Sequence, residues 1–270
     1  AFVSAPSYDP NIFVRGVTGK EYSALLKDPN RPLINRISQG GYAPASTVKP
    51  LLAIMGLNEG AITPYYRYFG GATFQIPGTA RKFRDWRRGG HGWLDVYRAI
   101  EVSADTFFYD MAYRVGIDKI HEYMTRFGFG QYSGIDIKEE SKGILPSREW
   151  KQKRHRQPWF QGDTISVGIG QGYWTSTLLQ LARAHSILTQ HGRIITPHIG
   201  MAFDSGEKQQ LITPAEQEPI AVKDDSYWGV SLEGMYLVNN GPEGSGRRAF
   251  AGTPYKAGGK SGTAQVVGMK

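Results

Sequence analysis

Cysteine is absent from the 270 residues of this chain, which excludes disulfide bonds, thiolate nucleophiles and cysteine-ligated zinc. No apolar run approaches the roughly 20 residues that a membrane-spanning helix needs. The first residues, AFVSAPSYDPN, lack the basic start and apolar stretch of a signal peptide and read as the end of a strand entering a loop. Internal repeats and low-complexity linkers are absent too. One large domain, or one domain with a smaller lobe, is therefore expected.

Positive charge is in excess, with a net charge of +8 and an isoelectric point near 9.5. This balance suits nucleic acid, anionic lipid or a polyanionic wall polymer as a partner. Two dense basic segments, RKFRDWRR (81–88) and KQKRHR (151–156), are interpreted as solvated faces. Because neither carries an aromatic RNA-binding strand or a zinc finger, no nucleic-acid partner is expected.

Apolar periodicity predicts an α+β fold with helices in the middle of the chain and strands towards its ends. Residues 61–92 and 128–175 are rich in glycine and aromatic residues and are predicted to be irregular. Strands are predicted as a pair within 192–203 and as a single strand at 255–268. Helices are predicted at 46–59, 94–102, 107–115, 117–127, 177–190 and 226–240.

The run YAPASTVKPLL (42–52) places a hydroxyl and an amine at helical spacing. Ser46 and Lys49 lie three residues apart, on the same side of a helix whose first turn tolerates Pro50. A serine becomes a nucleophile when a base accepts its proton, and a lysine can be that base when burial and nearby positive charge lower its pKa. Unpaired N–H groups at the helix start suit an oxyanion. Alone, the spacing fits a serine cap beside a solvated lysine equally well.

Two further short motifs follow along the chain. Ser103-Ala104-Asp105 lies at a predicted break between helices, where a second hydroxyl can relay a proton between Lys49 and a leaving amine. Lys260-Ser261-Gly262-Thr263 places a cation beside two hydroxyls on one face of a predicted strand, which can hold a carboxylate, and Gly262 leaves room for the ligand. Each motif alone fits an ordinary cap or strand. Their order matches the motif set of penicillin-binding proteins and serine β-lactamases.

The segments around these motifs resemble the transpeptidase domain of class B penicillin-binding proteins, and within that family the subgroup that acts in cell elongation. The resemblance covers essentially the whole chain. It implies a D,D-transpeptidase that crosslinks peptidoglycan stem peptides and is acylated by β-lactams. The similar segments are SAPSYDPN (4–11), NRISQGGYAPASTVKP (35–50), EVSADTFFYD (101–110), REWKQKR (148–154), PWFQGDTISVGIGQGYWT (158–175) and KSGTAQV (260–266).

The first two motifs carry the catalytic roles that the resemblance implies. Ser46 resembles the acylated nucleophile and Lys49 its general base. Ser103 and Asp105 match the residues that relay protons and position Lys49. The wider family has asparagine where this chain has Asp105, and a carboxylate there can raise the pKa of Lys49, stay neutral or pair elsewhere. Because the elongation subgroup shares the aspartate, we interpret it as a mark of that subgroup.

The third motif carries the binding roles that the resemblance implies. Lys260 supports Ser103 and adds positive charge to the site. Ser261 and Thr263 resemble the hydroxyls that bind the D-alanine carboxylate, next to Gly262. The backbone N–H groups of Ser46 and Thr263 are expected to form the oxyanion hole. The family pattern requires no cofactor and no metal.

The resemblance also implies an architecture and a cellular setting. The expected fold is an antiparallel sheet with helices on both faces and an all-helical lobe, formed by residues 1–270 as one transpeptidase domain without the terminal strands of the sheet. The pedestal domain and a single-pass anchor in the bacterial inner membrane are expected outside this chain, on its periplasmic side. Expected partners are stem peptides, β-lactams, a membrane glycosyltransferase and a shape-determining scaffold protein. With its last strand unpaired, the isolated chain is expected to be less stable than a complete domain.

Several alternatives stay open at this stage. A D,D-carboxypeptidase shares the acylation step and differs only in using water as the acceptor. A β-lactamase or β-lactam sensor shares the fold, although no E-x-x-L-N segment is present to activate water. A non-catalytic wall-binding module would not need an intact Ser46 and Lys49. Asp85 and His91 are too few for a structural metal site, so we interpret them as surface residues.

Overall fold

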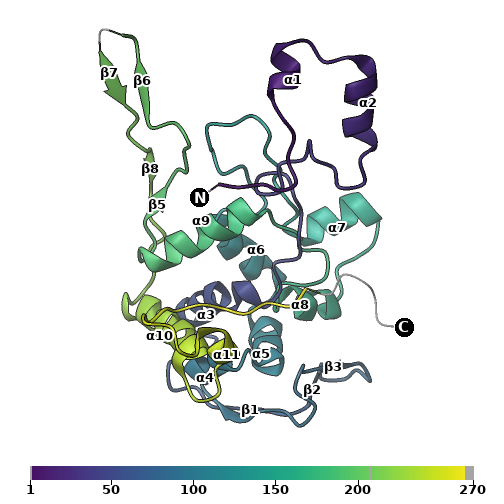
Figure 1. Cartoon of the computed structure of the whole chain (residues 1–270). Helices are drawn as coiled ribbons and strands as arrows, with labels where there is room; N and C mark the ends of the chain where they lie inside the picture. The colour runs from purple at the N-terminus through teal and green to yellow at the C-terminus, as the bar shows by residue number, and fades with distance from the viewer. Residues whose placement is uncertain (1, 207, 265–270) are drawn as a thin grey trace.

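The structure, a computed structural model, describes residues 2–206 and 208–264. It has the predicted α+β class, with a helical body from which a thin two-stranded arm projects (Figure 1). Within the described residues, no helix is both long and apolar enough to cross a membrane. The helices are α1 (Asn11–Val14), α2 (Gly19–Lys27), α3 (Lys49–Asn58), α4 (Val96–Glu101), α5 (Asp105–Val115), α6 (Ile117–Arg126), α7 (Arg148–His155), α8 (Gln161–Val167), α9 (Leu178–Thr189), α10 (Ser226–Asn240) and α11 (Arg247–Phe250).

Helix α3 is the centre of the body, and all ten of its residues are buried. Its apolar residues lie on every side, as expected for a helix enclosed by other helices. It packs against α4, α5, α6, α9 and α10. The predicted helix at 46–59 is confirmed, with a 3₁₀ turn, η1 (Ala45–Val48), in front of α3 and Pro50 in the first turn of α3. This packing fixes the backbone that carries Ser46 and Lys49.

The other periodic helices are also confirmed, because each buries one apolar face against this centre. Helix α6 buries Ile117, Ile120 and Met124, and α4, α5, α9 and α10 begin and end within two residues of prediction. The helices α1, α2, α7, α8 and α11 were not predicted. Helix α7 is rich in charge, so its apolar periodicity is weak, although Ser147 caps it by accepting from the N–H of Trp150. Helix α2 has a capping box between Thr18 and Glu21.

The strands form two-stranded antiparallel sheets, and the described residues do not contain the expected central sheet with helices on both faces. Within 61–92, predicted to be irregular, short strands do occur. The pair predicted within 192–203 is wrong in its partners, because the chain runs out along β5 and β6 and returns along β7 and β8. The strands are β1 (Tyr68–Gly70), β2 (Thr73–Gln75), β3 (Lys82–Arg84), β4 (Gly92–Leu94), β5 (Ile194–Ile195), β6 (Ala202–Asp204), β7 (Gln209–Leu211) and β8 (Glu216–Gln217).

The strand predicted at 255–268 is not formed over 255–264, and residues 265–268 lie outside the described part. The segment contacts a helix instead of another strand. The N–H of Gly259 donates to the carbonyl of Met235 at 3.0 Å, and the amide of Asn239 donates to the carbonyl of Ala257 at 3.1 Å, both from α10. The segment then passes over η1 towards α8 (Figure 1). Helix α10 thus forms hydrogen bonds with backbone groups of this segment that would pair with a neighbouring strand in a sheet.

Candidate active site

Ser46 lies in η1 on a turn that is held from both sides. The residue before it, Ala45, has φ of +50°, a left-handed conformation that costs a residue with a Cβ about 1–2 kcal/mol. The N–H of Ala45 donates to the carbonyl of Gly170 at 2.8 Å, and His185 Nε2 lies 3.0 Å from the carbonyl oxygen of Thr47. These contacts keep the half-buried serine at the start of α3 in spite of the backbone strain.

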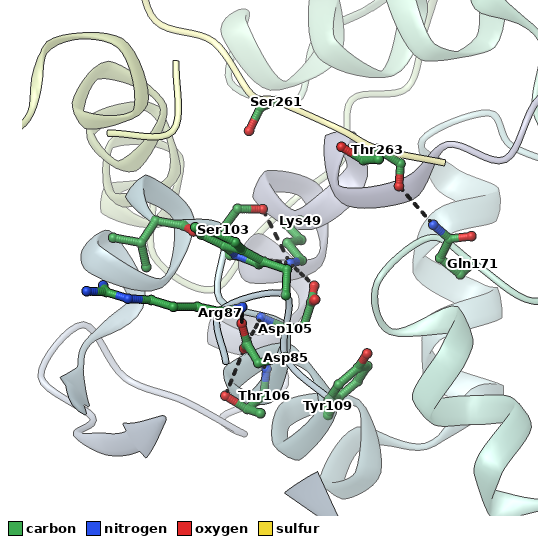
Figure 2. Close-up of polar contacts among 12 residues, drawn as sticks. Lys49, Asp85, Arg87, Ser103, Asp105, Thr106, Tyr109, Gln171, Ser261 and Thr263 are labelled. Atoms are coloured by element: carbon green, nitrogen blue, oxygen red, sulfur yellow. Dashed lines mark hydrogen bonds and ion pairs between the residues drawn. The ribbon is translucent and has the colours of Figure 1, made fainter. Parts of the chain in front are cut away.

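Lys49 is completely buried, and its amine contacts the second motif. Its Nζ lies 2.6 Å from Asp105 Oδ1, 2.9 Å from the carbonyl oxygen of Ser103 and 3.4 Å from Ser103 Oγ. Within the described residues, no hydrogen bond joins this amine to the hydroxyl of Ser46. Figure 2 shows the amine between Ser103, which precedes the cap of α5, and Asp105, the first residue of α5. Two motifs separated by 54 residues thus meet at one amine.

The protonation of Lys49 reflects two opposing effects. Complete burial lowers its pKa, because a charged ammonium loses its hydration. The Asp105 carboxylate raises the pKa through charge and hydrogen bonding, and the charge of Asp85 adds to this. The burial effect is the larger one, so the net pKa is below that of a free lysine. One alternative from the sequence was that Asp105 pairs with Lys49 and raises its pKa. The pair is present, but burial still lowers the pKa of Lys49.

Ser103 also occupies a left-handed turn, with φ of +58°. Its carbonyl oxygen accepts from Lys49 and from the indole N–H of Trp86, which also donates to the carbonyl of Val102. The indole ring itself is largely exposed and packs edge-on against His91. The turn that presents the second hydroxyl is therefore fixed by side chains from outside the motif.

Lys260 lies near this pair but does not contact Ser103 in the described residues. Its Nζ donates to the carbonyl of Ser261 at 2.9 Å. Burial and the positive charge of Lys49 lower the pKa of Lys260 to about 6, although the charge of Asp105 opposes them. The hydrogen bond from Lys260 to Ser103 that the expected support would use is therefore not formed in this conformation.

The rest of the third motif crosses directly over η1. A Cβ on Gly262 would lie 2.7 Å from Thr47 Cγ2, so this glycine allows the segment to approach the serine turn rather than only leaving room for a ligand. The hydroxyls of Ser261 and Ser245 lie 2.7 Å apart. Gln171 Nε2 donates to the carbonyl of Thr263 at 3.1 Å, as Figure 2 shows. All three motifs thus converge on one face of α3.

Some residues at this site were missed or misinterpreted from the sequence. Asp85 and His91, interpreted as surface residues, are buried and pair with each other at 2.9 Å. Trp86, Gln171 and Ser245 also contact the motifs, and no local pattern marks them. Lys151, within the basic segment 151–156, is buried against Asp163 rather than solvated. Within residues 2–206 and 208–264, no cluster of three or more histidine, cysteine or acidic residues could hold a metal ion.

A serine at a helix start, a buried lysine one turn later and a second serine at the lysine amine are typical of active-site-serine acyltransferases. The family model described as "Penicillin binding protein transpeptidase domain" matches residues 1–270. The chain belongs to this family.

Individual proteins show the same similarity. The "Peptidoglycan D,D-transpeptidase MrdA" of Escherichia coli K12 is 51% identical over 270 residues, which cover 100% of this chain and 43% of that protein. The chain thus spans less than half the length of this curated relative. The Pseudomonas aeruginosa PBP2 structure in complex with WCK 5153 has a TM-score of 0.91 at 44% identity, covering 98% of this chain and 59% of that one. The Helicobacter pylori complex of PBP2 and MreC gives 0.87 at 30%, covering 98% and 47%.

Proposed function

We propose that this chain is the transpeptidase domain of a peptidoglycan D,D-transpeptidase of cell elongation, and that it acts through an acyl-enzyme on Ser46. The main support is Lys49, which lies one turn after Ser46. Its buried amine has a lowered pKa and contacts the hydroxyl of Ser103. A neutral amine in this position can accept the serine proton. The family membership and the identity to MrdA support the choice of stem peptides as substrate.

In the first step, Ser46 Oγ attacks the carbonyl carbon of the penultimate D-alanine while Lys49 accepts the hydroxyl proton. The backbone N–H groups of Ser46 and Thr263 stabilise the oxyanion. The C–N bond then breaks, and the leaving D-alanine amine receives the proton from Lys49 through Ser103. Lys260, Ser261 and Thr263 bind the terminal carboxylate of the donor peptide next to Gly262. The product is an ester on Ser46.

In the second step, the amino group of another stem peptide attacks the ester carbonyl. Lys49 accepts a proton from this amine and a proton is returned to the oxygen of Ser46 as the C–O bond breaks. The new amide bond joins the two stem peptides. β-Lactams react by the first step alone, since opening of the ring C–N bond leaves the amine attached to the acyl group.

The setting of the reaction is also a proposal. The resemblance favours the periplasmic face of a bacterial inner membrane, with an anchor and a pedestal domain outside residues 1–270. A shape-determining scaffold protein is a proposed partner, supported by the Helicobacter pylori complex of PBP2 with MreC. A membrane glycosyltransferase is proposed from the resemblance, and β-lactam binding is supported by membership of the penicillin-binding family.

Intact-mass spectrometry after incubation with a penicillin tests the acylation step. We expect one stoichiometric adduct on the wild type and none on Ser46→Ala. An adduct that persists in Ser46→Ala would identify a different nucleophile. Slow release of the adduct supports a transpeptidase, whereas rapid turnover of penicillin would indicate a β-lactamase. Stem-peptide substrates offered with and without an amine acceptor then separate transpeptidase from D,D-carboxypeptidase activity.

A further inference from the structure

Asp85, which belongs to none of the three motifs, contacts both the end of the second motif and the first turn of α5. Its Oδ2 accepts from the backbone N–H of Asp105 at 2.8 Å and of Thr106 at 2.9 Å, and from Thr106 Oγ1 at 3.2 Å. Its Oδ1 accepts from the N–H of Arg87 at 3.1 Å and lies 2.9 Å from His91 Nε2. The side chains of both Asp85 and His91 are fully buried. Figure 2 shows Asp85 next to Asp105 and Thr106, the first two residues of α5.

Asp85 supplies a hydrogen-bond acceptor that the start of α5 lacks. The first N–H groups of a helix have no partner within the helix, and a neighbouring cap residue normally accepts from them. At α5 the cap position is Ala104, whose side chain offers no acceptor. Asp85 supplies the acceptor from a loop 20 residues earlier, and its negative charge is favourable at the positive end of the helix.

The carbonyl side of the same turn is held from other directions. Trp86, next to Asp85, donates its indole N–H to the carbonyls of Val102 and Ser103, and Lys49 donates to the carbonyl of Ser103. Residues 85 and 86 thus bind both the N–H and the carbonyl groups of segment 102–106. Ser103 within it keeps a left-handed φ of +58° that a free chain would rarely adopt.

We propose that Asp85, supported by His91, is a positioning residue that sets the placement of Ser103 and Asp105 against Lys49. It does not touch the reacting atoms. Its effect on rate rests on the proposed acyl-enzyme function. Burial opposes its ionisation, but hydrogen bonds from His91 and from the backbone of Thr106 outweigh this and hold the pKa of Asp85 below the ordinary value, so the carboxylate is charged at neutral pH.

The substitution Asp85→Asn in the full-length protein tests this role, because it keeps the size but presents an NH₂ group to neighbours that are themselves donors. Time courses of penicillin acylation at several concentrations separate the binding constant from the acylation rate constant. We expect the rate constant to fall on the order of 100-fold, as for a displacement of about 1 Å. The binding constant and the final adduct stoichiometry should stay near the wild-type values. A role in folding alone would lower the final stoichiometry and leave the rate constant unchanged.

Asp136→Asn is the control for losing a carboxylate that binds the backbone, because Asp136, although exposed, also accepts from two backbone N–H groups, those of Ile199 and Gly200 between β5 and β6, at 2.8 and 2.7 Å. It should acylate at the wild-type rate. If Asp85→Asn does not fold, His91→Phe removes the partner of Oδ1 at similar volume and should lower the rate constant by a smaller factor. A wild-type rate constant in either folded variant overturns the proposal. Failure of the wild type itself to form an adduct would instead refute the proposed function.

Discussion

The two halves of the candidate site differ in how firmly they are held. The half that carries Lys49, Ser103 and Asp105 is buried between α3 and α5, and side chains from several segments fix it. The half that carries Ser261 and Thr263 is an extended segment with exposed residues, held over η1 by a small set of hydrogen bonds. We infer that the first half is preorganised for acylation, and we call it the rigid half. We infer that the second half binds the substrate carboxylate and adjusts when a ligand arrives, and we call it the adjustable half.

The largest effect is expected from removing the base in the rigid half. Lys49→Met should lower the acylation rate constant on the order of 1,000-fold, because Ser46 loses the group that accepts its proton. Acylation time courses followed by mass spectrometry measure it. Lys151→Met is the matched control, since Lys151 is likewise buried and paired with a carboxylate, Asp163, at 2.5 Å. Equal losses in both variants would mean that any buried lysine matters through stability alone.

The serine turn in the rigid half can be broken through its neighbour Gly170. This glycine has φ of +72°, and a Cβ there would collide with the carbonyl of Ala45. Gly170→Ala should lower the free energy of unfolding by about 2–5 kcal/mol, the sum of left-handed strain and overpacking. Gly78→Ala isolates the strain, because a Cβ at this φ of +77° meets no described atom within 4 Å, and should cost about 1–2 kcal/mol. If urea unfolding gives equal losses of the free energy of unfolding for Gly170→Ala and Gly78→Ala, the close approach of Gly170 to the carbonyl of Ala45 is contradicted.

The adjustable half should respond to pH through Lys260. Burial and the charge of Lys49 lower the pKa of Lys260 to about 6, so above pH 6 the amine is mostly neutral in the free protein. A bound carboxylate favours the charged amine, so binding takes up a proton. The affinity for a carboxylate-terminated stem peptide should fall by up to about tenfold per pH unit from pH 6 to 8 and level off below pH 6.

Titration calorimetry on the Ser46→Ala protein measures this affinity without acylation. Two buffers of different ionisation enthalpy report the proton uptake directly. Lys260→Met should bind more weakly and lose the dependence on pH. An affinity that stays constant between pH 6 and 8 in the unsubstituted Lys260 background would show that this amine is already charged in the free protein.

The features that the sequence could predict are those that leave a local pattern, and the features that it could not predict depend on contacts between distant residues. Helices with one apolar face, such as α6 and α9, were visible because their burial leaves a period in the sequence. The motif residues were found by spacing and by resemblance, although their roles stay predictions. The buried carboxylate of Asp85 was not found, because it contacts residues 20 positions away and no local pattern encodes that distance. The last strand was predicted from the alternation late in residues 255–268, but strand formation depends on a neighbour that a local pattern does not show.

The smallest effect is expected at Ser245, whose hydroxyl lies 2.7 Å from that of Ser261. The loop that carries Ser245 is fixed at α4, because the Glu101 carboxylate accepts from the N–H of Glu243 at 3.0 Å and the Glu101 carbonyl accepts from the N–H of Ser245. Ser245→Ala should therefore remove one neutral hydrogen bond and weaken carboxylate binding by about 2- to 10-fold, with the acylation rate constant unchanged. Ser226→Ala, at the start of α10, is a control that should leave both quantities unchanged. A fall in the acylation rate constant of Ser245→Ala would show that the adjustable half also affects the geometry of the rigid half.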